Sequence, residues 1–273
     1  MTPFLSQIYV YPVKSLAGFP VAEWPVDKTG LRYDRKWMLV DENGQFLSQR
    51  RLPNMALIKT RIHNRQLLLA TAGQNDLILP LNNAEGEDIT VQVWKDSCLA
   101  KAAGPDADVW LSRVLGSSCR LVYLPEQQVR KVDPKYARAS DETAFSDGFP
   151  FLIVSESSLQ ALNQAMALDL DMIRFRPNLV AAGCASYAED SWREIVINGI
   201  GFRLPKPCSR CSVPTIDPET AVSAKEPLTT LSRLRKWQNQ VYFGQNALHD
   251  SLGVLTVGSE IQINLIGENQ PPL

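Results

Sequence analysis

The amino-terminal part of the chain alternates short apolar runs with turn residues, and this alternation constrains the fold more than any other feature. The predicted strands are Leu5–Val13, Lys36–Val40, Gln45–Ser48, Met55–Ile62, Gln66–Ala70, Asp76–Leu79 and Ile89–Trp94. Turns are expected at Asp41–Gly44, His63–Arg65, Ala72–Asn75 and Lys95–Ser97. Strands this short and this closely spaced predict a β-barrel or sandwich rather than alternating strand and helix units.

The remainder of the chain mixes helices with strands. Helical spacing predicts a helix over Asp106–Leu115, ended by Gly116, a second helix capped by Ser155, and a short third helix around Leu228–Leu234. The predicted strands are Cys119–Leu124, Phe151–Val154, Leu179–Ala182, Glu194–Ile197, Ile200–Leu204 and Val254–Leu265. Between them Pro125–Pro150 reads as a long polar loop, a feature that is usually functional or disordered. We therefore predict an α+β, β-rich fold with domains at 1–124 and 125–267 and a tail or linker at 268–273.

The amino-acid composition limits the classes of function that the protein can have. The 273 residues contain 28 Lys and Arg against 29 Asp and Glu, and this balance argues against general binding of nucleic acid. No apolar run reaches the roughly 18 residues that a membrane span requires. The amino terminus does not resemble a secretory signal, so a cytoplasmic location is expected. Five cysteines, an odd number, do not suggest a disulfide framework.

The segment KPCSRC, residues 206–211, is the strongest candidate for chemistry because it contains a Cys-x-x-Cys pair. A zinc site would need a second Cys or His pair, and the sequence has none. A dithiol redox motif usually opens a helix, whereas SVPTID follows here. One thiolate bound to a soft metal or cofactor, with Arg210 beside it, is the third use. Two ordinary cysteines at a strand end remain the plain alternative.

Four other segments carry polar residues at strand ends. Arg176 precedes Pro177, so its backbone is expected to be extended and stiff. Lys14 follows the first predicted strand and could meet a phosphate, and Arg35 is either solvated or paired with Asp34. Ser146, Asp147 and Gly148 form a turn that can offer backbone N–H groups to an anion. Each segment alone is explained equally well by an ordinary surface turn.

Together, the order of YPVKS, DRKW, FSDG, FRPN, YAEDSW, KPCSRC and PTIDPET closely resembles the MOSC-domain molybdenum enzymes. Within these, the chain looks like the amidoxime-reducing group, which comprises the mitochondrial amidoxime-reducing component and bacterial YcbX-like relatives. The resemblance runs from about Gln7 to about Ile263. It implies a MOSC-type amino-terminal β-barrel domain followed by a MOSC β-barrel domain with flanking helices.

The resemblance also implies a molybdopterin cofactor and a set of residues that bind it. The second cysteine of the motif, Cys211, matches the metal ligand. The matching cofactor contacts are Lys14, Ser15, Arg35, Ser146, Asp147, Gly148, Arg176, Asn178, Ser209 and Arg210. Gly148 stands where the family often has a hydroxyl residue, so any contact there would come from backbone. Asp147 is the predicted proton donor. A sulfur-rich site suits molybdenum, and arginines suit a phosphate.

The implied reaction is reduction of an N-hydroxylated base to the N–H product and water. Electrons would come from a separate protein, either ferredoxin-like or cytochrome b5-like and fed by a flavin reductase, because no dinucleotide-binding motif is visible. Two alternatives remain open. One is a sulfur carrier with a persulfide on Cys211, and the other is a non-catalytic module that binds the molybdenum cofactor. FGQN, residues 243–246, and the cysteines Cys184 and Cys208 have no assigned chemistry, although a structural role is expected for Cys208.

Overall fold

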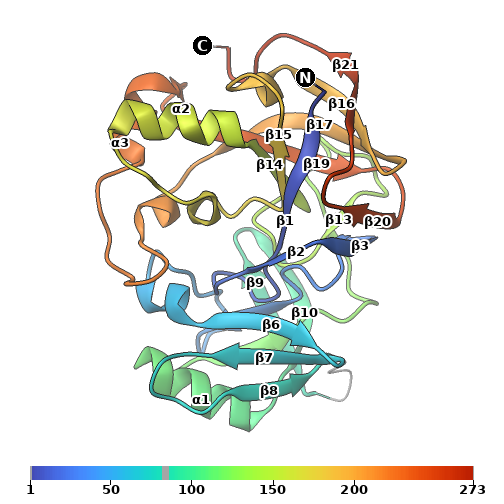
Figure 1. The fold of residues 1–273 in the computed structure, drawn as a ribbon. Coiled ribbons are helices and arrows are strands. Elements are labelled where there is room, and N and C mark those ends of the chain that lie inside the picture. Colours follow the sequence, from blue (N-terminus) through green and yellow to red (C-terminus); the bar gives the residue numbers. More distant parts are fainter. Residues whose placement is uncertain (1, 82–85, 273) are drawn as a thin grey trace.

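The computed structural model describes residues 2–81 and 86–272, and strands dominate it (Figure 1). The lower part in Figure 1 contains two small antiparallel sheets from the amino-terminal half of the chain. One runs in the order β5 (Trp37–Val40), β11 (Arg120–Tyr123), β10 (Asp96–Ala102) and β9 (Asp88–Val93). The other joins β6 (Lys59–His63), β7 (Gln66–Ala70) and β8 (Leu77–Pro80). The β-rich α+β class predicted from the sequence is confirmed.

A nine-stranded sheet forms the upper part of the molecule (Figure 1). Its main path is β2 (Phe19–Val21), β1 (Phe4–Val10), β15 (Leu179–Ala182), β14 (Phe151–Ser155), β19 (Gln240–His249), β17 (Ile200–Ser209), β16 (Trp192–Ile197) and β21 (Ile261–Ile266). A short strand, β18 (Lys236–Trp237), pairs with β19. Within this path only β14 and β15 run parallel, and the other pairs are antiparallel.

The first strands of the chain belong to the upper sheet although they come from the amino-terminal half. β1 pairs with β15, so Ile8 lies opposite Leu179. The next two strands, β3 (Glu23–Asp27) and β4 (Gly30–Leu31), form a three-stranded sheet with β20 (Gly253–Thr256). The two ends of the sequence are therefore joined by backbone hydrogen bonds, and the domain boundary near Pro125 stays a prediction.

Helices cover one face of the upper sheet (Figure 1). They are α2 (Glu156–Met166) and α3 (Leu228–Leu234), while α1 (Pro105–Leu115) packs in the lower part. The predicted stops and caps are confirmed: Gly116 takes a left-handed φ of 62° after α1, and the Ser155 hydroxyl accepts a hydrogen bond from the Ser158 amide at 3.2 Å. No helix in the described residues is long and apolar enough to cross a membrane.

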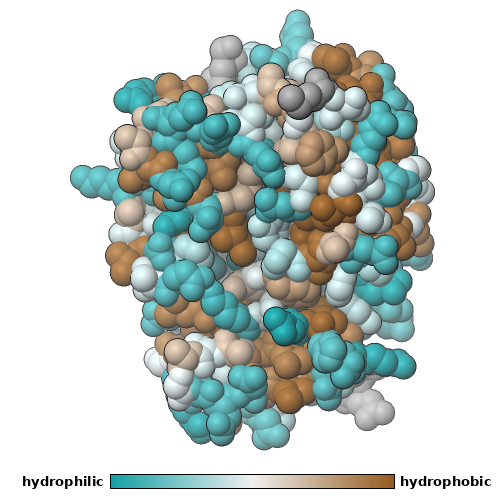
Figure 2. Space-filling model, viewed as in Figure 1, coloured by the Kyte–Doolittle hydropathy of each residue, from teal (hydrophilic) through white to brown (hydrophobic). Residues whose placement is uncertain are grey.

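Successive side chains of the central strands point to opposite faces of the sheet, and this divides the core into layers. In β14, Phe151 and Ile153 face one buried cluster, while Leu152 and Val154 face the cluster beneath α2 and α3. The strand is buried throughout, as a central strand covered on both faces should be. Figure 2 shows hydrophilic and apolar residues interspersed over the visible face of both parts. The large apolar clusters consist of buried residues.

Short 3-10 turns and short strands complete the chain. The 3-10 turns are η1 (Pro53–Leu57), η2 (Met172–Phe175), η3 (Ala188–Asp190) and η4 (Val213–Thr215). The long loop at 125–150 contains one minimal ladder, β12 (Arg130–Lys131) with β13 (Glu142–Thr143). Turns with two left-handed residues close three hairpins, at Asn64–Arg65, Asn198–Gly199 and Gln238–Asn239.

Several predicted strands are wrong in extent. Gln45–Ser48 makes only isolated bridges, from Gln45 and Phe46. Met55–Ile62 splits because Pro53 starts a 3-10 turn before β6. Val254–Leu265 is two strands separated by a turn with Gly258 at a φ of 92°.

Other strands were missed or misplaced at their ends. The turn expected at Lys95–Ser97 is shorter, because β10 begins at Asp96. The first strand ends at Val10 instead of Val13. Local sequence patterns did not predict β2, β3, β4, β10, β12, β13, β18 or β19.

Candidate functional site

One cavity of about 160 Å³ brings together every residue for which the sequence predicted a cofactor contact. The lining includes Lys14, Ser15, Arg35, Ser146, Asp147, Gly148, Arg176, Asn178, Ser209, Arg210 and Cys211. These residues come from five segments spread from position 14 to position 211. The structure thus places them side by side, and their individual roles stay predictions.

Sheet register explains most of this convergence. The end of β1 lies beside the start of β15, and the start of β15 lies beside β14, where Ile153 pairs with Leu179. The loop after β1 carries Lys14, while the segments before β14 and β15 carry Asp147 and Arg176. These loops therefore meet at one edge of the upper sheet. Arg210 joins them from the end of β17, because its Nη2 donates to the Phe175 carbonyl at 2.7 Å.

Arg35 is held by its sequence neighbour. Its Nη1 lies 2.5 Å from Asp34 Oδ2, and the Asp34 side chain is almost fully buried. Arg35 adopts a left-handed φ of 50°, as does Ser15 at 68°. Such backbone is costly for residues other than glycine and tends to occur at functional sites. Of the two alternatives that the sequence left open for Arg35, the ion pair with Asp34 is the one observed.

The expected extended backbone at Arg176 is wrong. Arg176 has φ 56° and ψ 44°, in the left-handed region, and its N–H donates to the Ile173 carbonyl at 3.1 Å. The residue ends the 3-10 turn η2, and this capping role outweighs the usual extended preference before Pro177. Its Nη1 donates to the Leu16 carbonyl at 2.7 Å, while Nη2 is buried without a partner among the described residues. Burial, followed by the charge of Arg35, lowers the pKa of Arg176 to about 10, so it remains cationic at neutral pH.

Lys14 and Asp147 form an ion pair at the cavity. Lys14 Nζ also donates to the Phe145 carbonyl at 2.8 Å, and Trp94 Nε1 donates to Asp147 Oδ1 at 3.0 Å. Burial lowers the pKa of the Lys14 amine, while the charge of Asp147 opposes that shift. Desolvation raises the pKa of Asp147, but the charge and hydrogen bond of Lys14 outweigh it, and the net pKa lies well below the usual range. Asp147 is therefore ionised at neutral pH, and this arrangement gives no support to its predicted role as a proton donor.

The two cysteines of KPCSRC occupy different surroundings. Cys208 packs against the apolar cluster beneath the helices, and Arg210 Nη1 donates to its Sγ at 3.1 Å. Cys211 lies just beyond β17, on the cavity wall and ahead of the turn η4. The sequence paired Arg210 with Cys211, whereas the structure aims this guanidinium at Cys208. Arg210 Nε is buried without a partner among the described residues.

The remaining predicted contacts differ in what they can offer. The Asn178 side chain accepts from the Leu152 amide at 3.3 Å and donates to the Tyr9 carbonyl at 3.2 Å, so it already joins β1 to β14. Ser146 is buried at the cavity. A Cβ added to Gly148 would have no heavy atom within 4 Å, so open space adjoins this position.

Several residues that position the cavity loops were not predicted from the sequence. Arg130 is buried, and its guanidinium donates to the carbonyls of Ala144 and Ser146 and pairs with Asp96 at 2.7 Å. It therefore fixes the loop that carries Asp147. Asn246, from FGQN, lines the cavity and donates to the Pro207 carbonyl at 3.3 Å. No spacing pattern in the sequence predicts these contacts, because they depend on pairing between distant segments.

Buried polar contacts connect two other segments, YAEDSW (residues 187–192) and FGQN. Asp190, in YAEDSW, is buried 2.5 Å from Arg235 Nη2. Gln245 Nε2 donates to Asp190 Oδ1 at 2.8 Å and to the Gln270 carbonyl at 2.7 Å. The tail at 268–272 is thus attached to the upper sheet, and Pro271 is buried.

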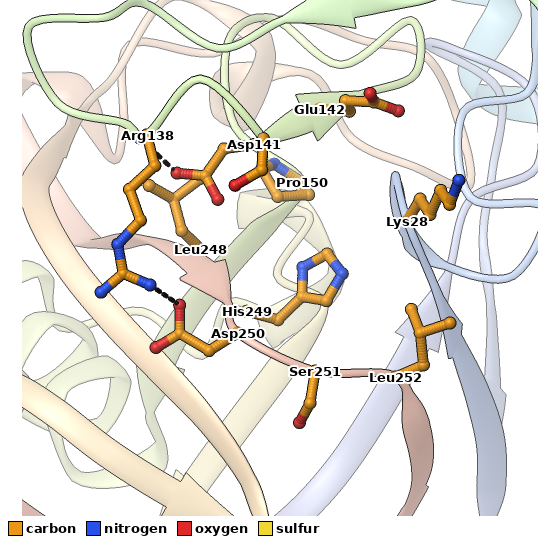
Figure 3. A pocket seen from close by; sticks show the side chains of 11 residues that line it. Lys28, Arg138, Asp141, Glu142, Pro150, Leu248, His249, Asp250, Ser251 and Leu252 are labelled. Carbon is orange, nitrogen blue, oxygen red and sulfur yellow. Dashed lines mark hydrogen bonds and ion pairs between the residues drawn. The ribbon is translucent and has the colours of Figure 1, made fainter.

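A larger cavity of about 380 Å³ lies elsewhere and is a weaker candidate (Figure 3). Several charged groups at this cavity are already engaged in ion pairs. Arg203 pairs with Asp141 at 2.8 Å and with Asp250 at 2.7 Å, and Arg138 pairs with Asp250 at 2.8 Å. Burial lowers the pKa of His249, which is therefore neutral at pH 7. Over the described ranges, no three His, Cys, Asp or Glu residues are grouped so as to hold a metal ion by themselves.

Comparison with known proteins identifies the family. Residues 2–118 match the MOSC N-terminal beta barrel domain, and residues 140–262 match the MOSC domain. Mitochondrial amidoxime-reducing component 1 from Mus musculus is 34% identical over 95% of this chain and 82% of its own length, and the Homo sapiens protein is also 34% identical over the same shares. Molybdenum cofactor sulfurase from Danio rerio is 32% identical over 94% of this chain but only 34% of its own length. The chain belongs to the MOSC-domain family that includes the mitochondrial amidoxime-reducing components.

Proposed function

We propose that this protein is a molybdenum-cofactor-dependent reductase of N-hydroxylated compounds, with Cys211 as the protein ligand of the metal. The observation that carries the proposal is the convergence of four cations and a thiol on one cavity. Lys14 is paired with Asp147, and Arg35 is paired with Asp34. Arg176 and Arg210 have no carboxylate partner among the described ion pairs, so two positive charges are unbalanced. A phosphate monoester, which carries up to two negative charges, complements them.

The donor set fits a molybdopterin in a second respect. Two guanidinium nitrogens, Arg176 Nη2 and Arg210 Nε, are buried without partners among the described residues. Buried donors normally have acceptors, so these two nitrogens are suited to donate to oxygen atoms of a ligand. In this proposal Lys14, Arg35, Arg176 and Arg210 hold the phosphate. Ser15, Ser146, Asp147, Gly148, Asn178 and Ser209 shape the remaining wall.

When bound, the cofactor would supply the two-electron reduction that converts N–OH to N–H and water. The chain's own residues would orient the substrate. Asp147 has a side chain that is 63% exposed, and it is ionised, so it can accept hydrogen bonds from the N–H and O–H groups of an amidoxime. Its lowered pKa suits this role better than proton donation.

Turnover tests this function directly. The purified holoprotein is supplied with an amidoxime and, in separate reactions, with NADH alone, with NADH and a ferredoxin or cytochrome b5 system, or with a chemical reductant. We expect reduction with the chemical reductant and with a reconstituted electron-donor protein. Robust turnover with NADH alone would contradict dependence on a partner protein. Failure with every electron source, in protein that contains molybdenum, would favour a non-catalytic cofactor-binding module.

A sulfur carrier is the second candidate, favoured by one contact and one similarity. The contact is the Arg210 guanidinium 3.1 Å from Cys208 Sγ, which would stabilise a thiolate or persulfide on Cys208 rather than on Cys211, the carrier residue expected from the sequence. The similarity is to molybdenum cofactor sulfurases, of which this chain spans about a third. Metal analysis separates the two functions, because a carrier would contain little molybdenum.

A further inference from the structure

Arg35 and Arg176 share an aromatic ring that the sequence analysis did not single out. The guanidinium carbon of each arginine lies 4.3 Å from the centroid of the Tyr11 ring. A cation at this distance over an aromatic face is attracted by the ring's electron density, most strongly where water is excluded. Tyr11 has no exposed surface, so both contacts are made away from water.

We infer that the Tyr11 ring is a positioning element that keeps Arg35 and Arg176 in place for the cofactor's phosphate. This inference rests on the proposed function. Two like charges near one another repel, and that repulsion must be offset before an anion arrives. Arg35 Nη2 lies 3.2 Å from the Arg176 carbonyl oxygen, so the two side chains occupy the same small region. The shared ring offsets part of the repulsion and leaves hydrogen-bonding atoms free for the ligand.

The ring itself, not the hydroxyl, performs this role. Tyr11 Oη is buried and has no hydrogen-bond partner among the described residues. Burial raises the pKa of Tyr11 well above its usual range, so the group stays a neutral phenol and adds no negative charge. Phenylalanine should therefore replace tyrosine without loss, whereas an aliphatic residue should not.

The position of the ring is fixed from several sides. The Tyr11 amide donates to Asp34 Oδ1 at 2.8 Å, and the Arg35 amide donates to the Tyr11 carbonyl at 2.7 Å. Gly18 packs directly against the ring, since a Cβ at this position would overlap two ring carbons. The same backbone contacts that place Arg35 thus place the ring beneath it.

The test measures cofactor loading rather than activity. Wild type, Tyr11→Phe, Tyr11→Leu and the control Tyr9→Leu are purified from a host that makes molybdopterin, and pterin per chain is measured by fluorescence after oxidation. Tyr9 is a suitable control because it lies only two residues before Tyr11, in β1, with its ring 6.4 Å from that of Tyr11. We expect full loading in Tyr11→Phe and Tyr9→Leu. Loading or affinity should fall about tenfold or more in Tyr11→Leu, the loss expected from two desolvated cation–π contacts.

A fluorinated ring keeps the test decisive if Tyr11→Leu does not fold. Stepwise fluorination of a phenylalanine at position 11 withdraws electron density while preserving shape, so affinity for the cofactor should fall with each added fluorine. Equal affinity along the series, or loss of loading in Tyr11→Phe, would overturn the role of the ring. If the wild type itself contains no pterin, the proposed function fails rather than this inference.

Discussion

At the residue scale, two ion pairs that each contain a buried side chain determine how the cavity is built. The Asp34 carboxylate receives the Arg35 guanidinium on one oxygen and the Tyr11 amide on the other. Lys14 is buried, and its partner Asp147 is further bonded by Trp94. Lys14 and Arg35 are thus held in place by neighbouring side chains. Substituting such a neighbour should first lower the free energy of unfolding of the protein.

Asp34→Asn tests this point. Removing one partner of a buried pair leaves the other charge uncompensated, which typically costs about 3–5 kcal/mol. The matched control is Asp27→Asn, which removes an ion pair with Arg32 whose side chains are 47% and 38% exposed, for Arg32 and Asp27 respectively. Exposed pairs contribute about 1 kcal/mol or less. Urea unfolding of both variants measures the difference, and similar losses in the two would contradict the assigned importance of Asp34.

At the element scale, the sequence predicted the helices well, but it predicted several strands and the contacts between elements poorly. Helices α1, α2 and α3 were found because caps and apolar spacing are local signals. The strand β19 was missed because Gly244, Gln245 and Asn246 interrupt its pattern, although it pairs with three other strands. The left-handed Arg176 was missed because the rule for residues before proline competes with capping of η2.

Gly244 explains why the apolar pattern of β19 is interrupted. Its φ is 78°, and a Cβ would lie 2.7 Å from Val154 Cγ2 and 2.8 Å from the Ile153 carbonyl oxygen. Gly244→Ala should therefore combine backbone strain with overpacking against β14, at a cost of about 3 kcal/mol or more. Gly199→Ala is the control, because Gly199 has φ 75° but no atom within 4 Å of the added Cβ, and it should lose about 1 kcal/mol. Thermal unfolding distinguishes them, and equal losses would show that the contact with β14 is unimportant.

At the scale of the whole molecule, the site exists because distant segments are hydrogen-bonded into one sheet. Lys14 and Arg35 line the cavity together with Arg176, and the pairing of β1 with β15, in which Ile8 lies opposite Leu179, brings Lys14 close to the start of β15. Short sequence motifs were enough to predict the candidate residues, and the structure brings these residues together at one cavity. The supporting contacts of Tyr11, Asp34 and Arg130 could not be named, because they depend on that long-range pairing. Whether the protein resides in the cytoplasm stays a prediction.

The content of molybdenum and molybdopterin in purified protein tests the central claim most directly. Wild type, Cys208→Ala and Cys211→Ala are made in a host that synthesises the cofactor, and metal and pterin are measured per chain. We predict close to one molybdenum per chain in wild type, since a thiolate completes a sulfur-rich ligand set. We also predict a folded Cys211→Ala protein that has lost activity and its sulfur ligation to the metal, and a Cys208→Ala protein that keeps substantial activity. Wild-type protein without molybdenum, or equal losses in the two variants, would contradict the assignment of Cys211 as the metal ligand.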